Sequence, residues 1–307
     1  MVNGKTICVT GAGGFIGSAV VKALVDQGAA VRTLIGAPGD LVREPPPGVP
    51  GIRAEITDTA AICPLIAGAE VVVHLAGPAL VSASFEAAGE YARVHVDGTV
   101  ALLDLCRSLG VKHFIYMSSA EVYGRPHTHP VREDHPLQAR SPYAAAKIGA
   151  ERFVEAFALA FGMQVVILRP FSIYGPGLSP HSLIGTIVQQ ALRGTAVRLA
   201  HLQPVRDYCC VDDLAAAVVR ACTARLSNPF IANIGTGIGT SVAELATLIL
   251  GKLGRAIPVQ EEPWRRRPGH SEIYSLVADA RLARETLGWM PKFPLPYGLE
   301  RLIHTMI

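Results

Sequence analysis

The start of the chain places a glycine-rich turn between a short apolar run and a segment with helical patterning. Thr6–Thr10 has the length and the β-branched content of a buried strand, and residues 17–27 are long enough for a helix. Glycines at positions 11, 14 and 17 give the spacing G-x-x-G-x-x-G. Glycine lets backbone N–H groups approach a ligand closely, and the N-terminus of the following helix favours negative charge. A strand, a glycine turn and a helix in this order therefore predict a site for the pyrophosphate of a dinucleotide.

Short apolar runs alternate with helical segments through the first half of the chain. The strand-like runs are Thr6–Thr10 and residues 31–35, 71–75, 114–118 and 165–169. Residues 17–27, roughly 90–109 and 143–161 are long enough to be crossover helices. Nearly continuous apolar runs are typical of a parallel sheet that is covered on both faces. We therefore expect an α/β fold: a doubly wound Rossmann-type parallel sheet with a smaller, interleaved C-terminal substrate lobe.

The pattern changes after Arg169, where proline and glycine become frequent. Farther on, Ser241 and Glu244 have the spacing of a capping box and mark the start of another helix. We expect residues 1–171, together with roughly 206–232, to form the dinucleotide-binding Rossmann domain. Residues 172–205 and 233–307 are expected to form the substrate-binding lobe.

The composition is that of a globular chain without a strongly charged region. Of the 307 residues, 50% are hydrophobic and 17% are charged, and the formal net charge is +3. So small a charge does not favour nucleic acid or an acidic membrane as a partner. No apolar run approaches the roughly 18 residues that a membrane span requires, and the N-terminus has no signal-peptide pattern. We therefore expect a cytoplasmic protein that binds neither nucleic acid nor membrane.

The pattern of cysteines is also typical of a cytoplasmic protein. Six are present, at positions 8, 63, 106, 209, 210 and 222, and they form no C-x-x-C pair. Several lie in apolar segments, which is typical of reduced, buried thiols and not of a disulfide framework or a zinc site. No metal is expected.

The choice of dinucleotide is left open by the second apolar run. A carboxylate at the end of this strand normally binds the adenosine ribose. Residues 31–35 offer no acid there, and Asp40 comes several residues late. Arg32 and Arg43 could instead meet a 2′-phosphate. These residues leave the choice between NAD and NADP open.

Tyr143 and Lys147 stand four residues apart, just after Ser141 and Pro142, at the expected start of a helix. At this spacing the two side chains share one helix face. A nearby ammonium group favours the phenolate and lowers the pKa of a phenol from its usual value of about 10. The pair indicates a tyrosine that acts as a base near neutral pH, although the same spacing also occurs on solvated helix surfaces.

The glycine turn, the Tyr–Lys pair and several later blocks resemble the extended short-chain dehydrogenase/reductase family. The resemblance is to its NAD-dependent epimerase/dehydratase branch, which acts on nucleotide sugars, and it covers essentially the whole chain. The blocks are TGAGGFIG (10–17), VHLAG (73–77), SSAEVYG (118–124), the Tyr143–Lys147 pair, RPFSIYGPG (169–177), RDYCCVDD (206–213), RPGH (267–270) and LGW (287–289). Several blocks in order are far more specific than any one of them.

The resemblance implies roles for the residues at matching positions. The catalytic residues would be Tyr143 as base, Lys147 as its helper and Ser119, which holds the substrate hydroxyl, with Glu121 close by. The resemblance implies NAD as the cofactor, with NADP not excluded. The cofactor would be bound by Tyr143 and Lys147 together with Gly11, Gly14, Phe15, Ile16, Gly17, Glu55, Ile56, Leu75, Ala76 and Gly77. The nucleotide sugar would be bound by Ser119, Ser172, Arg206, Arg267 and Tyr274.

Three positions depart from the family pattern. His95 stands where the family usually has asparagine, Ser172 replaces an asparagine that often touches the substrate diphosphate, and His270 replaces an aspartate. We interpret His95 as a structural, hydrogen-bonded histidine. The change at Ser172 leaves the nucleotide of the substrate and its pose open.

The two arginines with implied substrate roles also have simpler interpretations. A guanidinium group suits phosphate oxygens and stays charged. Arg206 could instead form a salt bridge with Asp207 or Asp212, and Arg267 could lie in a solvated turn.

The residues after Ser119 differ between members of the family that catalyse different reactions. The 4,6-dehydratases generally carry an Asp-Glu pair there, whereas this chain has Ala120 and Glu121. The leading hypothesis is an NAD(P)-dependent nucleotide-sugar 4-epimerase that works through a transient 4-keto sugar. The alternatives are a nucleotide-sugar decarboxylase, a 4,6-dehydratase or a ketoreductase, and, outside enzymes, a non-catalytic NAD(P)-binding regulator.

The resemblance also implies a homodimer. The family commonly pairs helices that correspond to residues 98–109 and 143–161. Ala144–Ala146 would permit close approach of such helices, although these alanines could equally face the sheet.

Overall fold

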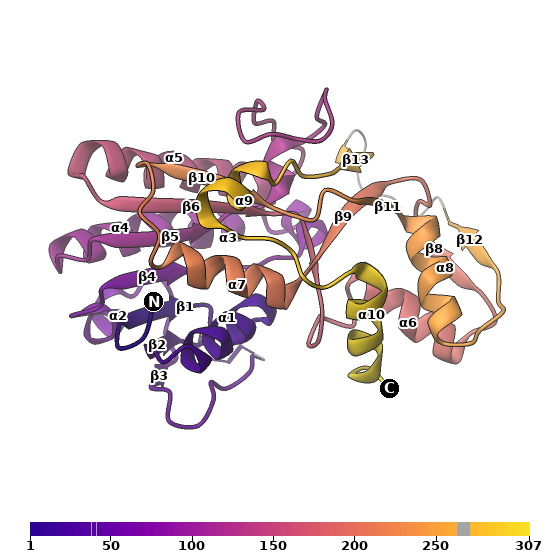
Figure 1. Cartoon of the computed structure of the whole chain (residues 1–307), viewed down its shortest axis with the longest axis horizontal. Coiled ribbons are helices and arrows are strands. Elements are labelled where there is room, and N and C mark those ends of the chain that lie inside the picture. Colours follow the sequence, from indigo (N-terminus) through magenta and orange to yellow (C-terminus); the bar gives the residue numbers. More distant parts are fainter. Residues whose placement is uncertain (38, 41, 263–270) are drawn as a thin grey trace.

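Seven parallel strands form the central sheet of the computed structural model, which describes residues 1–37, 39–40, 42–262 and 271–307. Their order is β10-β6-β5-β4-β1-β2-β3 (Figure 1). In chain order they are β1 (Thr6–Thr10), β2 (Ala30–Leu34), β3 (Gly51–Ile52), β4 (Val71–His74), β5 (His113–Met117), β6 (Gln164–Pro170) and β10 (Phe230–Ile234). Every neighbouring pair is parallel, so the predicted α/β class with a Rossmann-type sheet is confirmed.

Helices cover both faces of this sheet, because its apolar strands must be shielded from water on both sides. On one face, α1 (Phe15–Asp26) packs against α7 (Val211–Ala221), and α9 (Arg281–Leu287) contacts α7 and β10. The other face carries α2 (Thr59–Ile66), α4 (Gly98–Ser108) and α5 (Pro142–Phe161), with α4 beside α5 (Figure 1). Each face has its own buried apolar cluster, so the sheet separates two cores.

Short irregular elements precede two of these helices. A 3₁₀ turn (Val81–Phe85), the short helix α3 (Ala88–Ala92) and a π-helical turn (Arg93–Asp97) lead into α4. Another 3₁₀ turn (Ala120–Tyr123) follows β5. Single π turns inside helices are frequent at functional sites.

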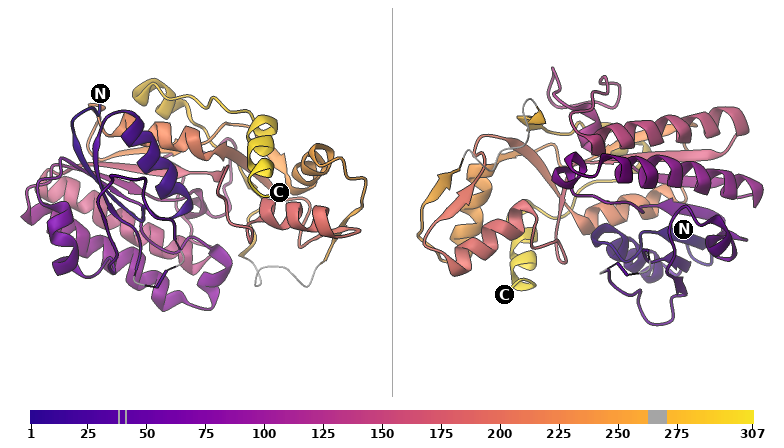
Figure 2. Two further views of the ribbon diagram at one scale, coloured as in Figure 1. Left: turned by 90° about the horizontal axis from the view of Figure 1, so that it is seen from below. Right: turned by 180° about the vertical axis from the view of Figure 1, so that it is seen from behind.

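The second lobe is built from short strands and helices. β9 (Val205–Cys210) pairs with β7 (Ser172–Tyr174), β11 (Gly239–Ser241) and β13 (Ser275–Leu276), and β8 (Val197–Leu199) pairs with β12 (Val259–Glu261). The helices α6 (Leu183–Arg193), α8 (Val242–Lys252) and α10 (Leu295–His304) surround a separate apolar cluster. Figure 2 shows this lobe beside one end of the central sheet.

The chain crosses between the two lobes more than once. β9 belongs to the sheet of the second lobe, whereas β10, which follows α7, returns to the central sheet and ends at Ile234. The residue bounds predicted for the two domains stay a prediction. Within the described residues, no helix has both the length and the hydropathy to cross a lipid bilayer.

Candidate active site

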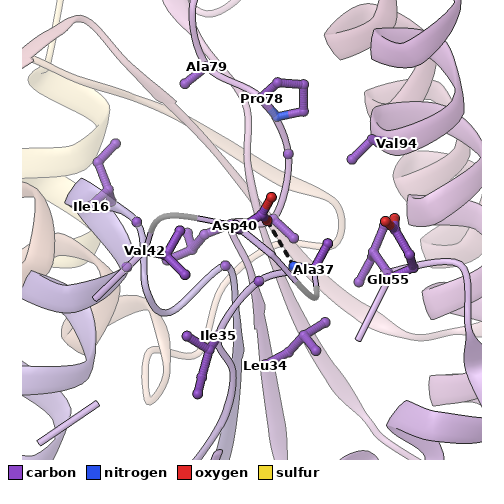
Figure 3. A pocket seen from close by; sticks show the side chains of 18 of the residues that line it. Ile16, Leu34, Ile35, Ala37, Asp40, Val42, Glu55, Pro78, Ala79 and Val94 are labelled. Carbon is purple, nitrogen blue, oxygen red and sulfur yellow. Dashed lines mark hydrogen bonds between the residues drawn. The ribbon is translucent and has the colours of Figure 1, made fainter. Parts of the chain in front are cut away.

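A cavity of about 450 Å³ lies where β1, β2, β4 and β5 end (Figure 3). Carboxyl ends of parallel strands are the usual place for a ligand in a doubly wound sheet. Ten lining residues are those to which the sequence assigned the dinucleotide: Gly11, Gly14, Phe15, Ile16, Gly17, Glu55, Ile56, Leu75, Ala76 and Gly77. The structure therefore brings all ten of them together, although their binding role stays a prediction.

The glycine turn has the form that a pyrophosphate site requires. Gly11 has a φ of 68°, and a Cβ there would lie 2.7 Å from the backbone nitrogen of Ala76. A Cβ at Gly17 would collide with the carbonyl oxygen of Gly11. α1 starts after Gly14 and has no side-chain cap, so its first N–H groups are available to an anion. The turn thus fits a dinucleotide.

A chain of buried hydrogen bonds connects this turn to the helix α4. Thr99 Oγ1 donates to the carbonyl oxygen of His95 at 2.5 Å, so it accepts from His74 Nε2 at 3.0 Å. His74 Nδ1 then accepts from Thr10 Oγ1 at 2.7 Å. Burial lowers the pKa of His74 to about 3, so its ring is neutral and can serve as both donor and acceptor.

The polar residues around the end of β2 face in different directions. Asp40 lines the cavity, and its Oδ2 accepts from the backbone N–H of Ala37 at 2.9 Å. Arg32 donates to the carbonyl oxygen of Ala67 at 2.7 Å, and Arg43 donates to that of Gly177 at 2.8 Å. Neither arginine is among the lining residues of the cavity.

The structure brings Ser119, Tyr143 and Lys147 together, as the sequence predicted. α5 starts at Pro142, where Ser141 Oγ accepts from the N–H of Ala144 at 3.1 Å, and this cap fixes the turn that carries Tyr143. Tyr143 and Lys147 are both buried. Lys147 Nζ donates at 2.8 Å to the carbonyl oxygen of Met117, which lines the cavity. The hydroxyl of Ser119 is hydrogen-bonded to Tyr143.

The electrostatics of this group differ from the expectation that Lys147 lowers the pKa of Tyr143. Burial raises the pKa of Tyr143, and the charge of Glu121 raises it further; only the hydrogen bond from Ser119 lowers it. Burial also lowers the pKa of Lys147 to about 7, against the opposing charge of Glu151. The expectation was wrong for this structure because loss of water disfavours the phenolate and the ammonium alike.

His95 lies in the π turn and packs against Tyr143. Its ring centroid is 5.6 Å from that of Tyr143 in an edge-to-face arrangement, and Tyr91 packs on Tyr143 in the same manner at 6.1 Å. His95 Nε2 donates to the carbonyl oxygen of Pro78 at 2.9 Å. Burial lowers the pKa of His95 to about 2, so the ring is neutral. The hydrogen bond agrees with a structural histidine, but the contact with Tyr143 was not predicted.

Three of the residues predicted to bind the substrate lie on or next to the sheet of the second lobe. Arg206 on β9 donates to the carbonyl oxygen of Val205 and approaches Glu272 Oε1 at 3.4 Å. Its ion-pair partner is therefore Glu272, and not Asp207 or Asp212 as one interpretation of the sequence held. Tyr274 is exposed and lies next to β13, and Ser172 begins β7, which pairs with β9.

Two further predicted positions, Arg267 and His270, lie outside the described residues. Sequence reasoning missed Arg125, which lies over the ring of Tyr274 at 5.4 Å and donates to the carbonyl oxygen of Glu272 at 2.7 Å. The only signal for it was its place directly after the SSAEVYG block.

Comparisons with known proteins agree with this geometry. The profile of the NAD dependent epimerase/dehydratase family matches residues 7–235. The chain is 32% identical to UDP-glucose 4-epimerase of Mycolicibacterium smegmatis, with 96% of each chain covered. It is 33% identical to dTDP-glucose 4,6-dehydratase of Streptomyces griseus, with 97% of this chain and 92% of that one covered. A crystal structure of Thermus thermophilus UDP-glucose 4-epimerase in complex with NAD superposes with a TM-score of 0.89 at 28% identity, with 98% of each chain covered.

Proposed function

This chain belongs to the NAD dependent epimerase/dehydratase family, and from this membership we propose that it is a nucleotide-sugar 4-epimerase that uses NAD. The observation that carries the proposal is the group formed by the half-buried Ser119 and the buried Tyr143 and Lys147, beside a cavity whose glycine turn fits a dinucleotide. The family membership makes the chain an enzyme. The retention of Ser119, Tyr143 and Lys147 side by side supports this over the regulator hypothesis.

The cofactor and the chain divide the chemistry between them. When bound, NAD supplies the oxidation of the sugar at C4 and the matching reduction. The chain supplies binding and proton transfer: Tyr143 takes the proton of the 4-hydroxyl group and later returns it. The sugar would turn over in between, so that the configuration at C4 is inverted with no net oxidation. Ser119 orients the reacting hydroxyl, and its hydrogen bond to Tyr143 favours the phenolate.

The site favours epimerisation over loss of water. Elimination of water requires a proton donor near the leaving hydroxyl, and the position after Ser119 holds the buried methyl group of Ala120. Glu121 keeps one carboxylate in this region, so a 4,6-dehydratase, a decarboxylase and a ketoreductase remain the alternatives. Each alternative releases a product that a 4-epimerase does not.

We also propose that Arg206 binds the diphosphate of the substrate, that the chain forms a homodimer and that it is cytoplasmic. A nucleotide diphosphate would compete with Glu272 for Arg206, whose separation of 3.4 Å leaves this ion pair weak. The exposed apolar side chains of Phe153 and Leu159 on α5 support a homodimer through α4 and α5. Free thiols at the six cysteines support a cytoplasmic location.

The test is product analysis after incubation with UDP-, dTDP-, GDP- and CDP-sugars, read by NMR. We expect the 4-epimer of one sugar without net formation of NADH. Tyr143→Phe should lower the rate by about 10²–10⁴-fold, the usual contribution of an acid–base residue. Tyr91→Phe is the matched control, because this neighbouring phenol donates to the carbonyl oxygen of Leu80 instead. Loss of water or carbon dioxide, or stoichiometric NADH, would overturn the proposal.

A further inference from the structure

We infer that His95 is a positioning residue, whose ring holds the ring of Tyr143 in the orientation in which the tyrosine oxygen meets Ser119. The inference rests on the proposed function, in which Tyr143 takes and returns the proton. It goes beyond the structural role that the sequence suggested for this histidine, because it gives the ring of His95 an effect on the rate of the reaction.

The side chain of Tyr143 is held at its ring and at its oxygen by different parts of the chain. The rings of His95 and Tyr91 both pack edge-to-face with that of Tyr143, at centroid distances of 5.6 and 6.1 Å. The hydroxyl of Tyr143 is hydrogen-bonded to Ser119. Aromatic pairs favour a defined geometry between the two rings. The two ring contacts therefore restrict rotation of the tyrosine and aim its oxygen.

The ring of His95 is itself fixed in place. Its Nε2 donates at 2.9 Å to the carbonyl oxygen of Pro78, a residue that lines the cavity (Figure 3). The backbone carbonyl oxygen of His95 accepts from Thr99 Oγ1 at 2.5 Å, and its ring packs on that of Tyr91 at 5.9 Å. A catalytic group is held precisely when the residues around it are themselves locked. His95 meets this condition for Tyr143.

A ring at position 95 is more than the hydrogen bond to Pro78 requires. With Nε2 as the donor, Nδ1 of the neutral ring is an acceptor, and among the described residues it has no hydrogen-bond partner. A buried polar atom without a partner costs stability. A glutamine could donate to Pro78 without a ring and without this cost. The packing on Tyr143 is what the ring adds.

The backbone around His95 is shaped to place this ring. His95 lies in the π turn Arg93–Asp97, where the wider hydrogen-bonding pattern changes the direction of side chains relative to an ordinary helix. Gly77 lines the cavity on the other side, and a Cβ there would collide with Cε1 of the His95 ring. The absence of a side chain at Gly77 thus leaves the space that the ring occupies beside Tyr143.

The experiment compares kcat and KM of the full chain and its variants for the nucleotide sugar that it epimerises. His95→Gln keeps a donor for Pro78 but removes the ring. We expect kcat to fall about tenfold, because a small displacement of a catalytic group lowers the rate strongly. KM should stay within about twofold of the wild type, since the sugar does not contact the altered ring. His95→Phe restores a ring without the donor and should return kcat to within about threefold of the wild type.

His113→Gln is the matched control. The Nε2 atom of His113 is also buried and has no hydrogen-bond partner in the described part of the chain. His113 begins β5, whereas the cavity lies at the other end of this strand, at Met117. This variant should have the kcat of the wild type. If His95→Gln does not give the melting curve of a folded protein, His95→Asn takes its place. A kcat within twofold of the wild type in the folded variant without the ring, or a His95→Phe as impaired as that variant, would overturn the inference.

A second measurement requires neither sugar nor turnover. Every tyrosine is replaced by tyrosine with one ring fluorine, and the fluorine NMR signals of Tyr143 are those that Tyr143→Phe lacks. A ring that is held gives separate signals for fluorine on its two sides, whereas a ring that flips rapidly gives one averaged signal. We expect separate signals in the wild type and in His95→Phe, and one signal in His95→Gln. One averaged signal in the wild type, or separate signals in His95→Gln, would contradict the role of His95.

Failure of this inference and failure of the proposed function can be told apart. If the chain converts no nucleotide sugar, the epimerase proposal fails, and the fluorine signals alone decide whether His95 holds Tyr143. If the chain epimerises a sugar while His95→Gln leaves both kcat and the signals unchanged, only the role of His95 is contradicted.

Discussion

The hydroxyl of Ser119 sets how readily Tyr143 can lose its proton. Burial and Glu121 both raise the pKa of Tyr143, and the hydrogen bond from Ser119 opposes them. The Ser119 hydroxyl also accepts from the N–H of Glu121 at 3.2 Å, so the 3₁₀ turn holds it in place. In the proposed mechanism, this one hydroxyl both orients the substrate and lowers the pKa of the base.

We therefore predict that Ser119→Ala moves the rise of kcat/KM to higher pH. Loss of a hydrogen bond to the phenolate raises the pKa of Tyr143, so a higher pH is needed to form the base. One hydrogen bond to a charged group corresponds to about 1–2 pH units and about 10–100-fold in kcat/KM at pH 7. The measurement is the pH profile of kcat/KM.

Ser118→Ala is the matched control for this prediction. Ser118 is the neighbouring serine and is buried, and in the described part of the chain its hydroxyl has no hydrogen-bond partner. Its removal should leave the profile unchanged. Superposition of the Ser119→Ala profile on that of the wild type would contradict the role assigned to Ser119.

A second prediction at the residue scale concerns the stability of the chain at low pH, and it rests on two buried, neutral histidines. The pKa is lowered by burial to about 3 in His74 and about 2 in His95, and lies near 6.5 in an unfolded chain. Between these values the unfolded state binds more protons, so the free energy of unfolding falls as the pH decreases below about 6.5. Each histidine contributes about 1.4 kcal/mol per pH unit to this fall.

His95→Asn should remove one of these contributions. Urea unfolding at pH 6.5, 5.5 and 4.5 would then show a shallower loss of stability than in the wild type, by about 1.4 kcal/mol per pH unit. The exposed His181 provides the control, because His181→Asn should leave the slope unchanged. A slope for His95→Asn equal to that of the wild type would show that His95 is protonated in the folded chain.

The parts of the site that could be predicted from the sequence depend on neighbours in the chain. Gly11, Gly14 and Gly17 share one turn, and Tyr143 and Lys147 share one helix face, so their spacing along the chain predicts that each set lies together. The partner of Arg206, the packing of His95 on Tyr143 and the folding back of Asp40 depend on how loops meet across the fold. No local sequence pattern contains that information. The expected lowering of the pKa of Tyr143 by Lys147 was wrong for a similar reason, because the burial of a side chain depends on the tertiary structure.

At the scale of elements, a buried ion pair fastens α5 to β6. Arg169 Nη2 donates to Glu151 Oε2 at 2.6 Å and its Nε donates to Oε1 at 3.0 Å, and both side chains are almost fully buried. Arg169 also donates to the hydroxyl of Tyr123 at 3.0 Å. The network therefore connects the helix that carries Tyr143 with the sheet and with the 3₁₀ turn next to Ser119.

Glu151→Gln should destabilise the chain by about 3–5 kcal/mol, because it leaves the buried guanidinium without its counter-charge. Equilibrium unfolding in urea measures this change. Asp26→Asn, which breaks the exposed pair with Lys22, should cost no more than about 1 kcal/mol. A loss below about 1 kcal/mol for Glu151→Gln would mean that the pair is not what holds α5 against β6.

At the scale of the whole molecule, the outer surface of α5 is unusually apolar for a helix that faces water. Phe153 is 43% exposed and Leu159 is 75% exposed, and the exposed Ala156 and Ala160 lie between and beside them at helical spacing. Arg107 of α4 lies over the ring of Phe161 at 4.7 Å, so the two helices present one joined surface. Small residues between large ones allow another helix to approach closely.

This surface predicts that the chain is a dimer and that one charge can separate it. Leu159→Glu places a carboxylate where two apolar helices would meet, and an unpaired charge buried there is strongly unfavourable. The side chain is exposed within one chain, so the fold itself should be preserved. Multi-angle light scattering after size exclusion should give twice the chain mass for the wild type and the single mass for Leu159→Glu. Ile238→Glu makes the same change at a residue that is 69% exposed in the second lobe, and it should remain a dimer. If Leu159→Glu also keeps the double mass, the two copies meet through some surface other than α5.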